Sequence, residues 1–305
     1  MYIIFAKIIY LGFSIPGKIL NLLKLFFGYL ASRFVFLFGG NIFFKEFETD
    51  INIVKNIKHQ DLNIKVKLNN YWDYWRIRNF ESYPINYLRK DKDFNGSDDK
   101  KIIFYEIGAN TGYCSLLLSK FLENKGKVYS FEIEPTNYKT LCDNIILNKL
   151  KNITPMNIGV SDGDKISKFY YNTKFLQRKN RLPMSSMGMH SMKFDKNVHE
   201  EDFYCNSTFM TYQNIIETFK LEVPTHVYID AYGAEENIIK SITNSDTKFL
   251  PAKVMVDIEE NVKKIEESKI FKMLNSKNYQ LLSFQREKGV SYLPDNLQSI
   301  FVLKK

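Results

Sequence analysis

The sequence predicts an α/β fold with a doubly wound, mostly parallel sheet of seven strands and helices on both faces. After residue 101, short apolar segments alternate with longer segments of helical periodicity, which is typical of a parallel sheet covered by helices. Only a loop separates the last two apolar segments, so they predict a C-terminal antiparallel hairpin. In such sheets ligands bind at the carboxyl ends of the strands, where the strand order reverses.

The predicted elements follow from apolar runs bounded by turn residues. One earlier segment, "LNIKVKL" (62–68), alternates apolar and charged residues and predicts a half-exposed strand. Strands of the main sheet are expected at 102–107, 127–132, 153–158, 226–230, 253–258, 279–285 and 298–303, and helices at about 111–122, 135–149, 210–220, 233–242 and 262–275.

The composition divides the chain into three regions: an apolar, basic extension (1–45), an aromatic-rich α+β lead-in (46–100) and the α/β domain (101–305) with an insertion at 172–208. No acid precedes Glu46, and charges interrupt each apolar run before the ~18–20 residues of a spanning helix. The extension is predicted to be helical. It either lies as an amphipathic segment on a membrane surface or packs against the α/β domain or a partner subunit.

Bulk composition excludes some classes of protein. With 45% hydrophobic residues the chain is not disordered. Its net charge of +9 would suit nucleic acid, anionic lipid or an acidic glycan, but the charge is spread along the chain and no RNA-binding motif is present, so nucleic acid is not favoured. Cys114, Cys142 and Cys205 are far apart and odd in number, which indicates neither a disulfide framework nor a zinc site and fits the cytoplasm.

A glycine-containing loop follows the first strand of the α/β domain, in "FYEIGANTGYC" (104–114). Gly108 and Gly112 permit tight turns and close approach of a ligand, and the next helix offers its free N–H groups. The loop lacks the G-x-G-x-x-G pattern of dinucleotide sites. Glu106 beside it would repel a pyrophosphate and favours a ligand with an ammonium and a sulfonium, such as S-adenosylmethionine.

The second strand ends in another acid, within "VYSFEIEP" (128–135). Glu132 is placed to accept hydrogen bonds from both hydroxyls of a ribose, at roughly the spacing of about 20 residues expected for a ribose-binding acid. Glu134 is expected to face solvent or to cap the helix that begins at Pro135.

Four segments in order, "EIGANTGYCSLLL", "GKVYSFEIEPTNYKTLCDNIILNKLKNI", "NIGVSD" and "YIDAYGAEENIIKSI", resemble the FkbM-type S-adenosylmethionine-dependent methyltransferases, which have the class I, Rossmann-like fold. The resemblance covers roughly residues 101–260. It implies an O-methyltransferase acting on a sugar hydroxyl of a glycan, glycolipid or surface polysaccharide. The cofactor-binding residues implied by the glycine loop and by this resemblance are Glu106, Gly108, Ala109, Asn110, Thr111, Gly112, Glu132, Ile133, Ser161, Asp162 and Asp230.

The sequence departs from the family pattern at two places. Tyr232 stands where the family usually has a glutamate, and Gln213 and Asn214 replace its usual pair of acids. The change at Tyr232 leaves open a binding protein that keeps the fold without catalysis. The net charge of +9 leaves open a second alternative, a nucleic-acid methyltransferase.

Methyl transfer to a hydroxyl needs a general base or a Lewis-acid metal. Asp230 and Asp257 end two neighbouring predicted strands, and Tyr232 follows the first of them. The two aspartates could share a divalent cation (Mg²⁺ or Mn²⁺), or Asp230 could act as the base alone.

The insertion is rich in basic residues over its first half. Long loops of this kind are often lids or binding elements. Arg178 and Arg181 are predicted to face an anionic acceptor, with Ser185, Ser186 and His190 near the acceptor. The alternative is a solvated basic loop. Peripheral association with the inner membrane face and a homo-oligomer are also left open.

Overall fold

The computed structural model describes residues 53–68, 83–91, 101–172, 199–231, 233–258, 264–287 and 296–304. The chain divides into two compact units, Met1–Asn56 with Val66–Phe80 and Ile57–Lys65 with Glu81–Lys305. Strands β1 (Ile53–His59) and β2 (Leu62–Leu68) form a two-stranded sheet with residues in both units. The predicted extension at 1–45 lies outside the described residues. Among the described residues, no helix has the length and apolar character needed to span a membrane.

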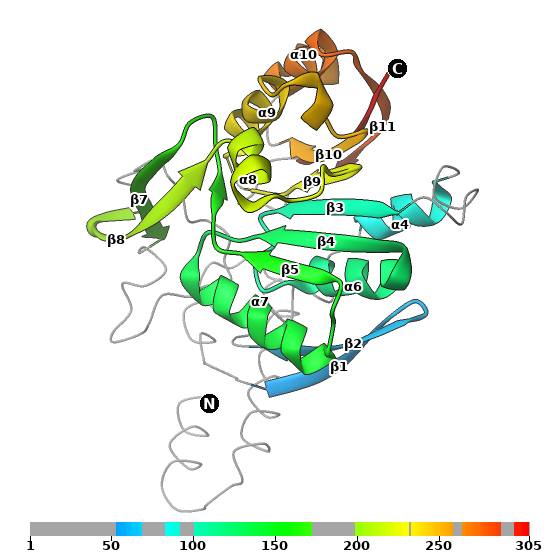
Figure 1. Ribbon diagram of the computed structural model, residues 1–305, viewed down its shortest axis with the longest axis vertical. Coiled ribbons are helices and arrows are strands. Elements are labelled where there is room, and N and C mark those ends of the chain that lie inside the picture. Colours follow the sequence, from blue (N-terminus) through cyan, green and yellow to red (C-terminus); the bar gives the residue numbers. More distant parts are fainter. Residues whose placement is uncertain are drawn as a thin grey trace, which may run out of the picture. The chain divides into compact units, whose positions relative to one another are not determined.

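The larger unit is built on the predicted seven-stranded sheet (Figure 1). Its strand order is β11-β12-β10-β9-β3-β4-β5, with β12 antiparallel to both of its neighbours and the other pairs parallel. The chain moves outward from β3 in one direction and later in the other, so the strand order reverses there. The strands are β3 (Ile102–Ile107), β4 (Gly126–Phe131), β5 (Ile153–Met156), β9 (His226–Ile229), β10 (Lys253–Ile258), β11 (Tyr279–Glu287) and β12 (Asn296–Leu303).

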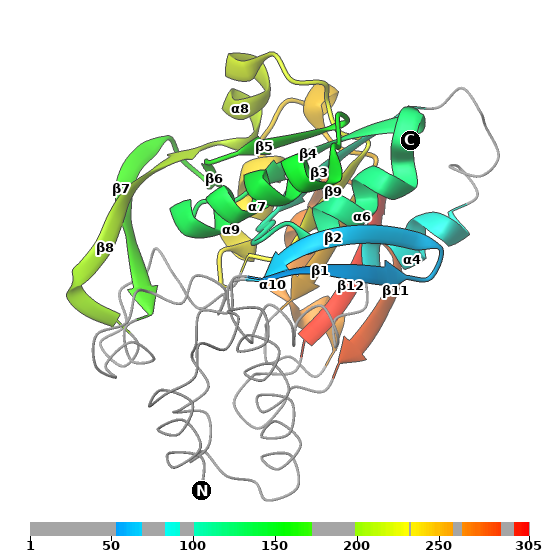
Figure 2. The same ribbon diagram turned by 90° about the horizontal axis from the view of Figure 1, so that it is seen from below.

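Helices cover both faces of this sheet (Figures 1 and 2). Odd-numbered residues of β3, such as Ile103 and Ile107, join one apolar cluster with Ile215, Ile239 and Leu274. That cluster lies between the sheet and α8 (Tyr212–Phe219), α9 (Glu235–Thr243) and α10 (Lys269–Ser276). The helices α4 (Tyr83–Lys90), α6 (Tyr113–Leu122) and α7 (Pro135–Asn148) belong to the opposite face.

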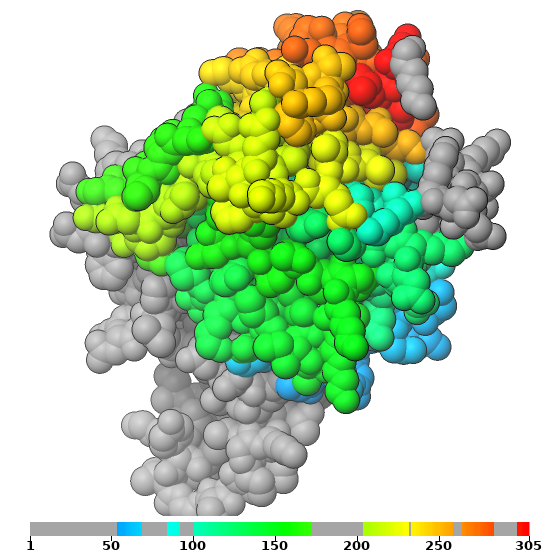
Figure 3. All heavy atoms as spheres, in the orientation of Figure 1, coloured from blue at the N-terminus to red at the C-terminus, as the bar shows by residue number. Residues whose placement is uncertain are grey.

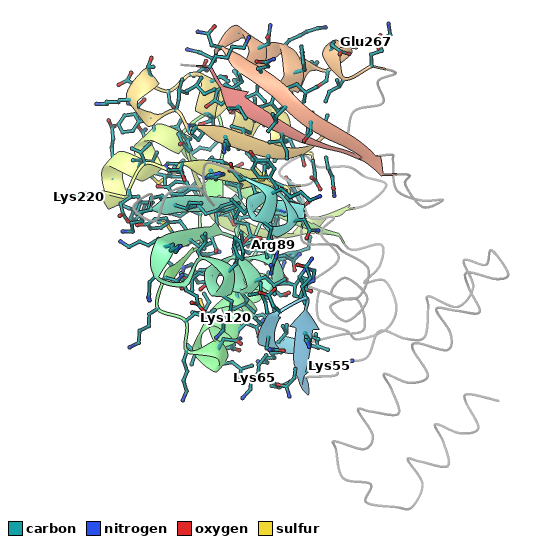
Figure 4. The ribbon with its side chains drawn as sticks, turned by 90° about the vertical axis from the view of Figure 1, so that its right-hand side faces the viewer. Lys55, Lys65, Arg89, Lys120, Lys220 and Glu267 are labelled. Atoms are coloured by element: carbon teal, nitrogen blue, oxygen red, sulfur yellow. The ribbon has the colours of Figure 1, made fainter. Side chains whose placement is uncertain are left out.

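The helices α4 and α6 contact each other through an arginine at the end of α4. The guanidinium of Arg89 lies 5.1 Å from the centre of the Phe121 ring and also pairs with Asp61. Figure 4 labels Arg89. The cation therefore covers an aromatic side chain while it stays partly in water.

The α6 side of the sheet carries a buried ionic cluster at the amino ends of β9 and β10. Asp91, directly after α4, binds the ammonium of Lys253 and lies 3.5 Å from Nε2 of His226. His226 also contacts Thr225 at 2.8 Å and stacks on Phe104. The side chains of Asp91 and Lys253 are only 5% and 7% exposed, so each charge depends on the other.

We expect Asp91→Ala to lower the free energy of unfolding by about 3–5 kcal/mol, because it leaves the Lys253 ammonium buried without its counter-ion. The double variant Asp91→Leu/Lys253→Met should recover most of this loss. Asp143→Ala, which removes the half-buried partner of the exposed Lys139, is the control and should cost less than about 1 kcal/mol. Urea unfolding measures all three. If Asp91→Ala lowered the free energy of unfolding by as little as the control does, Asp91 would not be the counter-ion of the buried Lys253 ammonium.

A second, three-stranded sheet was not predicted from the sequence. It has the order β6-β8-β7 and comprises β6 (Gly159–Val160), β7 (Lys165–Asn172) and β8 (His199–Met210). The segment expected as an insertion at 172–208 therefore ends in a long strand, and its residues 173–198 lie outside the described part of the chain.

Candidate active site at the carboxyl ends of the strands

The glycine loop between β3 and α6 has a backbone that only certain residues can adopt. Gly108, Asn110 and Gly112 have φ angles of 92°, 52° and 89°, in the left-handed region where glycine and asparagine are favoured. A Cβ at position 108 would lie 1.9 Å from the carbonyl oxygen of Asp230. The first glycine is therefore required because the loop touches the backbone that follows β9.

Hydrogen bonds hold this loop against the neighbouring strand. The N–H groups of Gly108 and Ala109 both donate to the carbonyl of Phe131 at 2.9 Å. The carbonyl of Thr111 accepts a 2.8 Å bond from the buried amide of Asn144 on α7. The helix α6 then begins at Tyr113 without a side-chain cap from Gly112. The N–H groups of its first turn are thus directed toward the loop.

Glu132 is fixed by the backbone around it. One carboxylate oxygen accepts a 2.6 Å bond from the N–H of Asn110, and the other accepts a 2.8 Å bond from the N–H of Glu134. Both oxygens of the Glu132 carboxylate are thus oriented by backbone N–H groups. Glu134 caps α7 by accepting from the N–H groups of Thr136 and Asn137, which confirms the second of the two roles expected from the sequence. Its side chain is buried and does not face solvent.

Strand register places a polar row across the α6 side of the sheet. Glu106 is level with Ser130 on β4 and with Tyr228 on β9. Because side chains two residues apart share a face, the next row at the strand ends contains Glu132, Gly108, Asp230 and Asp257. Three carboxylates thus lie in one row along the carboxyl ends of β4, β9 and β10, on both sides of the point where the strand order reverses.

Glu106 lies beneath this edge. It is 2% exposed and accepts a hydrogen bond from Ser115 on α6. Burial raises the pKa of Glu106 to about 8, and the nearby charges of Asp230 and Glu132 add to the increase. The hydrogen bonds from Ser115 and Cys114 oppose it. At neutral pH the Glu106 carboxyl is therefore mostly protonated.

Asp230 and Asp257 are neighbours because Ile229 and Val256 are paired directly across β9 and β10. Asp257 is buried and Asp230 is half-buried. Within the described ranges, no group of three or more His, Cys, Asp or Glu side chains is arranged to hold a metal ion. Two carboxylates alone do not complete the six oxygen ligands of Mg²⁺.

The segment predicted beside the adenine joins the two sheets. Ser161 is buried and donates its N–H to Met210 of β8. Asp162 accepts a 3.0 Å bond from the ammonium of Lys240 on α9, which lowers the pKa of Asp162. A Cβ at Gly159 would lie 2.4 Å from Ile133 and 2.5 Å from Phe209, so this glycine is required for close packing.

The remaining expectations fall into two groups. Gln213 accepts from the N–H of Asp246, and Asn214 donates to Asp164, so in this chain both amides pair with loops around α8. The other predicted acceptor-side residues lie outside the described residues and stay predictions: Arg178, Arg181, Ser185, Ser186, His190 and Tyr232.

Sequence reasoning missed several residues that shape the site, namely Ser115, Ser130, Tyr228 and Lys240. Ser130 and Tyr228 follow only from strand register. Ser115 and Lys240 act through contacts between elements, and no short motif marks them.

The chain matches a known protein family. Residues 106–289 match the family described as the methyltransferase FkbM domain. The tRNA(Phe) (4-demethylwyosine(37)-C(7)) aminocarboxypropyltransferase of Methanocaldococcus jannaschii is 37% identical over 68 residues, which are 22% of this chain and 26% of that relative. The chain thus spans only about a quarter of that curated relative's length.

Solved structures with a similar fold include M. jannaschii TYW2 in complex with AdoMet, which is 17% identical, with a TM-score of 0.40 over 84% of this chain and 88% of that one. Another is precorrin-6y C5,15-methyltransferase from Geobacter metallireducens GS-15, which is 14% identical, with a TM-score of 0.37 over 67% and 82% of the two chains. Because the family match covers more than half of its length, this chain belongs to the FkbM methyltransferase domain family and is an S-adenosylmethionine-dependent methyltransferase.

Proposed function

We propose that this protein methylates a hydroxyl group of a sugar in a glycan, glycolipid or surface polysaccharide. The observation that supports this proposal most is the position of Asp230. It directly follows β9, touches the glycine loop through Gly108, and lies level with Glu132 at the reversal point of the sheet. A carboxylate beside the cofactor loop can take the proton that a sugar hydroxyl loses on methylation.

The residues of the site fit S-adenosylmethionine. Gly108 and Gly112 let the loop pack directly against Asp230 and Leu141, which sets the loop backbone beside the methionine end, and Glu106 offers its carboxyl to the ammonium. Glu132, with each oxygen already oriented by one N–H, accepts from the two ribose hydroxyls. Ile133, Ser161 and Asp162 flank the adenine. When bound, the cofactor supplies an electrophilic methyl group whose transfer depends mainly on alignment.

On the acceptor side, Asp230 orients the sugar hydroxyl and accepts its proton. Asp257 lies next to it, at the end of the neighbouring strand. A divalent cation shared by the two aspartates stays the alternative, and it would need further oxygen ligands from the acceptor or from water. Tyr232, Arg178 and Arg181 remain predicted contributors on this side, with Ser185, Ser186 and His190.

Cofactor binding should release about one proton near pH 7, because the ammonium of the ligand favours the ionised form of Glu106, whose pKa in the free protein is about 8. The sign follows from the raised pKa: ligand affinity should rise with pH, by up to about tenfold per unit, until Glu106 is ionised in the free protein. Calorimetric titrations at pH 7 in phosphate and in Tris measure the proton release.

Glu106→Gln is the matched control, since the amide oxygen can still accept from Ser115 but cannot ionise. The proton release should vanish in this variant. Equal binding heats in both buffers for the unchanged protein, or proton release that persists in Glu106→Gln, would show that Glu106 does not face the ammonium.

The acceptor is tested with S-adenosylmethionine that carries a deuterated methyl group. The full chain is incubated with surface polysaccharide from a strain of the source organism that lacks this protein. We expect labelled methyl in a sugar, resistant to mild alkali as an ether is. Absence of label from every glycan fraction would contradict a sugar acceptor.

A second candidate is RNA, because the curated relative that matches over 68 residues is a tRNA-modifying enzyme. Total RNA from the same strain is therefore included in the assay. Label in nucleosides instead of sugars would favour this candidate.

A further inference from the structure

The strands β7 and β8 form an antiparallel ribbon, the β7–β8 ribbon, whose two faces differ. Phe169, Ser207 and Phe209 are buried on one face. The alternate residues make up the other face, which we call the outer face. Register pairs Ile166 with Thr208, Lys168 with Asn206 and Tyr170 with Tyr204 across this outer face. Figures 1 and 3 show the ribbon at the surface of the molecule.

The outer face combines aromatic, aliphatic and hydrogen-bonding side chains. Ile166 is 76% exposed and Tyr204 is 37% exposed. The rings of Tyr170 and Tyr204 are 5.9 Å apart at an angle of 60°, and the ammonium of Lys168 lies 4.0 Å from the centre of the Tyr204 ring. The tyrosine and lysine side chains thereby hold one another in place, so little conformational entropy is lost when a ligand contacts them.

We propose that the outer face of the β7–β8 ribbon binds an oligosaccharide, and that it holds part of the acceptor glycan away from the sugar that is methylated. This inference rests on the proposed function and adds a second contact surface for its substrate. The flat C–H face of a pyranose packs on tyrosine and isoleucine side chains. Its hydroxyls bond to the amide of Asn206, the hydroxyl of Thr208 and the ammonium of Lys168.

The charge of the ribbon favours a sugar chain over nucleic acid. Lys165 pairs with Phe209 on the buried face, so Lys168 is the one basic residue among the pairs named above for the outer face. A phosphate backbone carries one negative charge per nucleotide and is held by several cations along its path. A neutral or sparsely acidic glycan needs no such row of cations.

The position of the ribbon explains why the ligand would be longer than one sugar. At its inner end, Phe209 is paired with Gly159, and Gly159 packs closely against the side chain of Ile133, the residue directly after Glu132. Tyr204 is five residues farther along β8, which is about 16 Å at 3.3 Å per residue. A ligand that contacts both Tyr204 and the inner end of the ribbon must therefore be longer than a single sugar ring.

The test uses the full chain and oligosaccharides released by partial hydrolysis of the surface polysaccharide named above. Their retention is measured by affinity electrophoresis for the unchanged protein, for Tyr204→Ala and for Phe219→Ala. Phe219 is an aromatic residue 44% exposed on α8, outside the ribbon, and serves as the matched control. We expect Tyr204→Ala to weaken retention about tenfold. Phe219→Ala should retain the oligosaccharides as strongly as the unchanged protein does. All three proteins should bind S-adenosylmethionine with the same affinity.

Retention of no oligosaccharide, or equal retention by Tyr204→Ala, would overturn the inference. A single-stranded oligouridylate is the second probe, and its binding with loss in Tyr204→Ala would identify the face as a nucleic-acid surface instead. The two proposals fail separately. Sugar binding that depends on Tyr204, without methyl transfer, would contradict only the proposed methylation. Methyl transfer by Tyr204→Ala with the KM of the unchanged protein would contradict only the binding role of the ribbon.

Discussion

Replacing Asp230 by asparagine should lower kcat for methyl transfer by about 10²–10⁴-fold, the usual contribution of a general base. Asparagine keeps the size of the side chain and its hydrogen-bonding oxygen, and the loop contact at Gly108 involves the Asp230 backbone, which the substitution does not alter. The fold and the glycine loop should therefore persist. The variant loses the group that accepts the proton of the sugar hydroxyl.

The measurement is kcat in a labelled-methyl assay, together with cofactor affinity for the same variant. We expect the loss to fall on kcat, with affinity for S-adenosylmethionine changed by no more than a few-fold. Asp164→Asn is the matched control, since this aspartate accepts from the N–H of Thr211 and the amide of Asn214 at the start of α8. An Asp230→Asn enzyme with unchanged kcat would exclude Asp230 as the base. It would direct attention to Asp257 or to an activating metal.

The sequence predicted the central sheet well because its signals are local. Strands β3 and β10 have the predicted bounds, 102–107 and 253–258, since each is a mostly apolar segment buried on both faces. The helix α7 was predicted at 135–149 and observed at 135–148, because proline at its first position and the cap from Glu134 both mark its start.

The rest depended on contacts between distant residues. The β7–β8 ribbon is buried on one face only, and basic residues interrupt the apolar pattern in "KISKFYYN" (165–172), so no strand was expected there. Asp91 and Lys253 are 162 positions apart, and no local pattern could pair them. Glu106 was expected to face a ligand. Its burial and its bond to Ser115 depend on how α6 packs on β3.

Glu132 is the second residue whose removal should have a large effect. Its two oxygens are each oriented by one backbone N–H and face the end of β4, next to the glycine loop. If they accept from both ribose hydroxyls, their loss removes two hydrogen bonds to a charged group, each worth about 1.5–3 kcal/mol. Affinity for S-adenosylmethionine should then fall by at least about 100-fold.

Because Glu132 also orients Asn110, its removal could disturb the loop itself. Thermal unfolding without ligand monitors this effect. Glu132→Gln preserves the shape and one accepting oxygen, so it should lie between Glu132→Ala and the unchanged protein in affinity. Glu217→Ala, at an exposed position of α8, controls for the loss of a carboxylate elsewhere.

The most direct measurement is therefore calorimetric titration of S-adenosylmethionine into the unchanged protein, Glu132→Ala and Glu217→Ala at one pH. If carboxylates at the carboxyl ends of β3 and β4 hold the cofactor, the unchanged protein and Glu217→Ala should bind it tightly. The affinity of Glu132→Ala should be about 100-fold lower or more. Equal affinity in all three would place the cofactor elsewhere and contradict the assigned site.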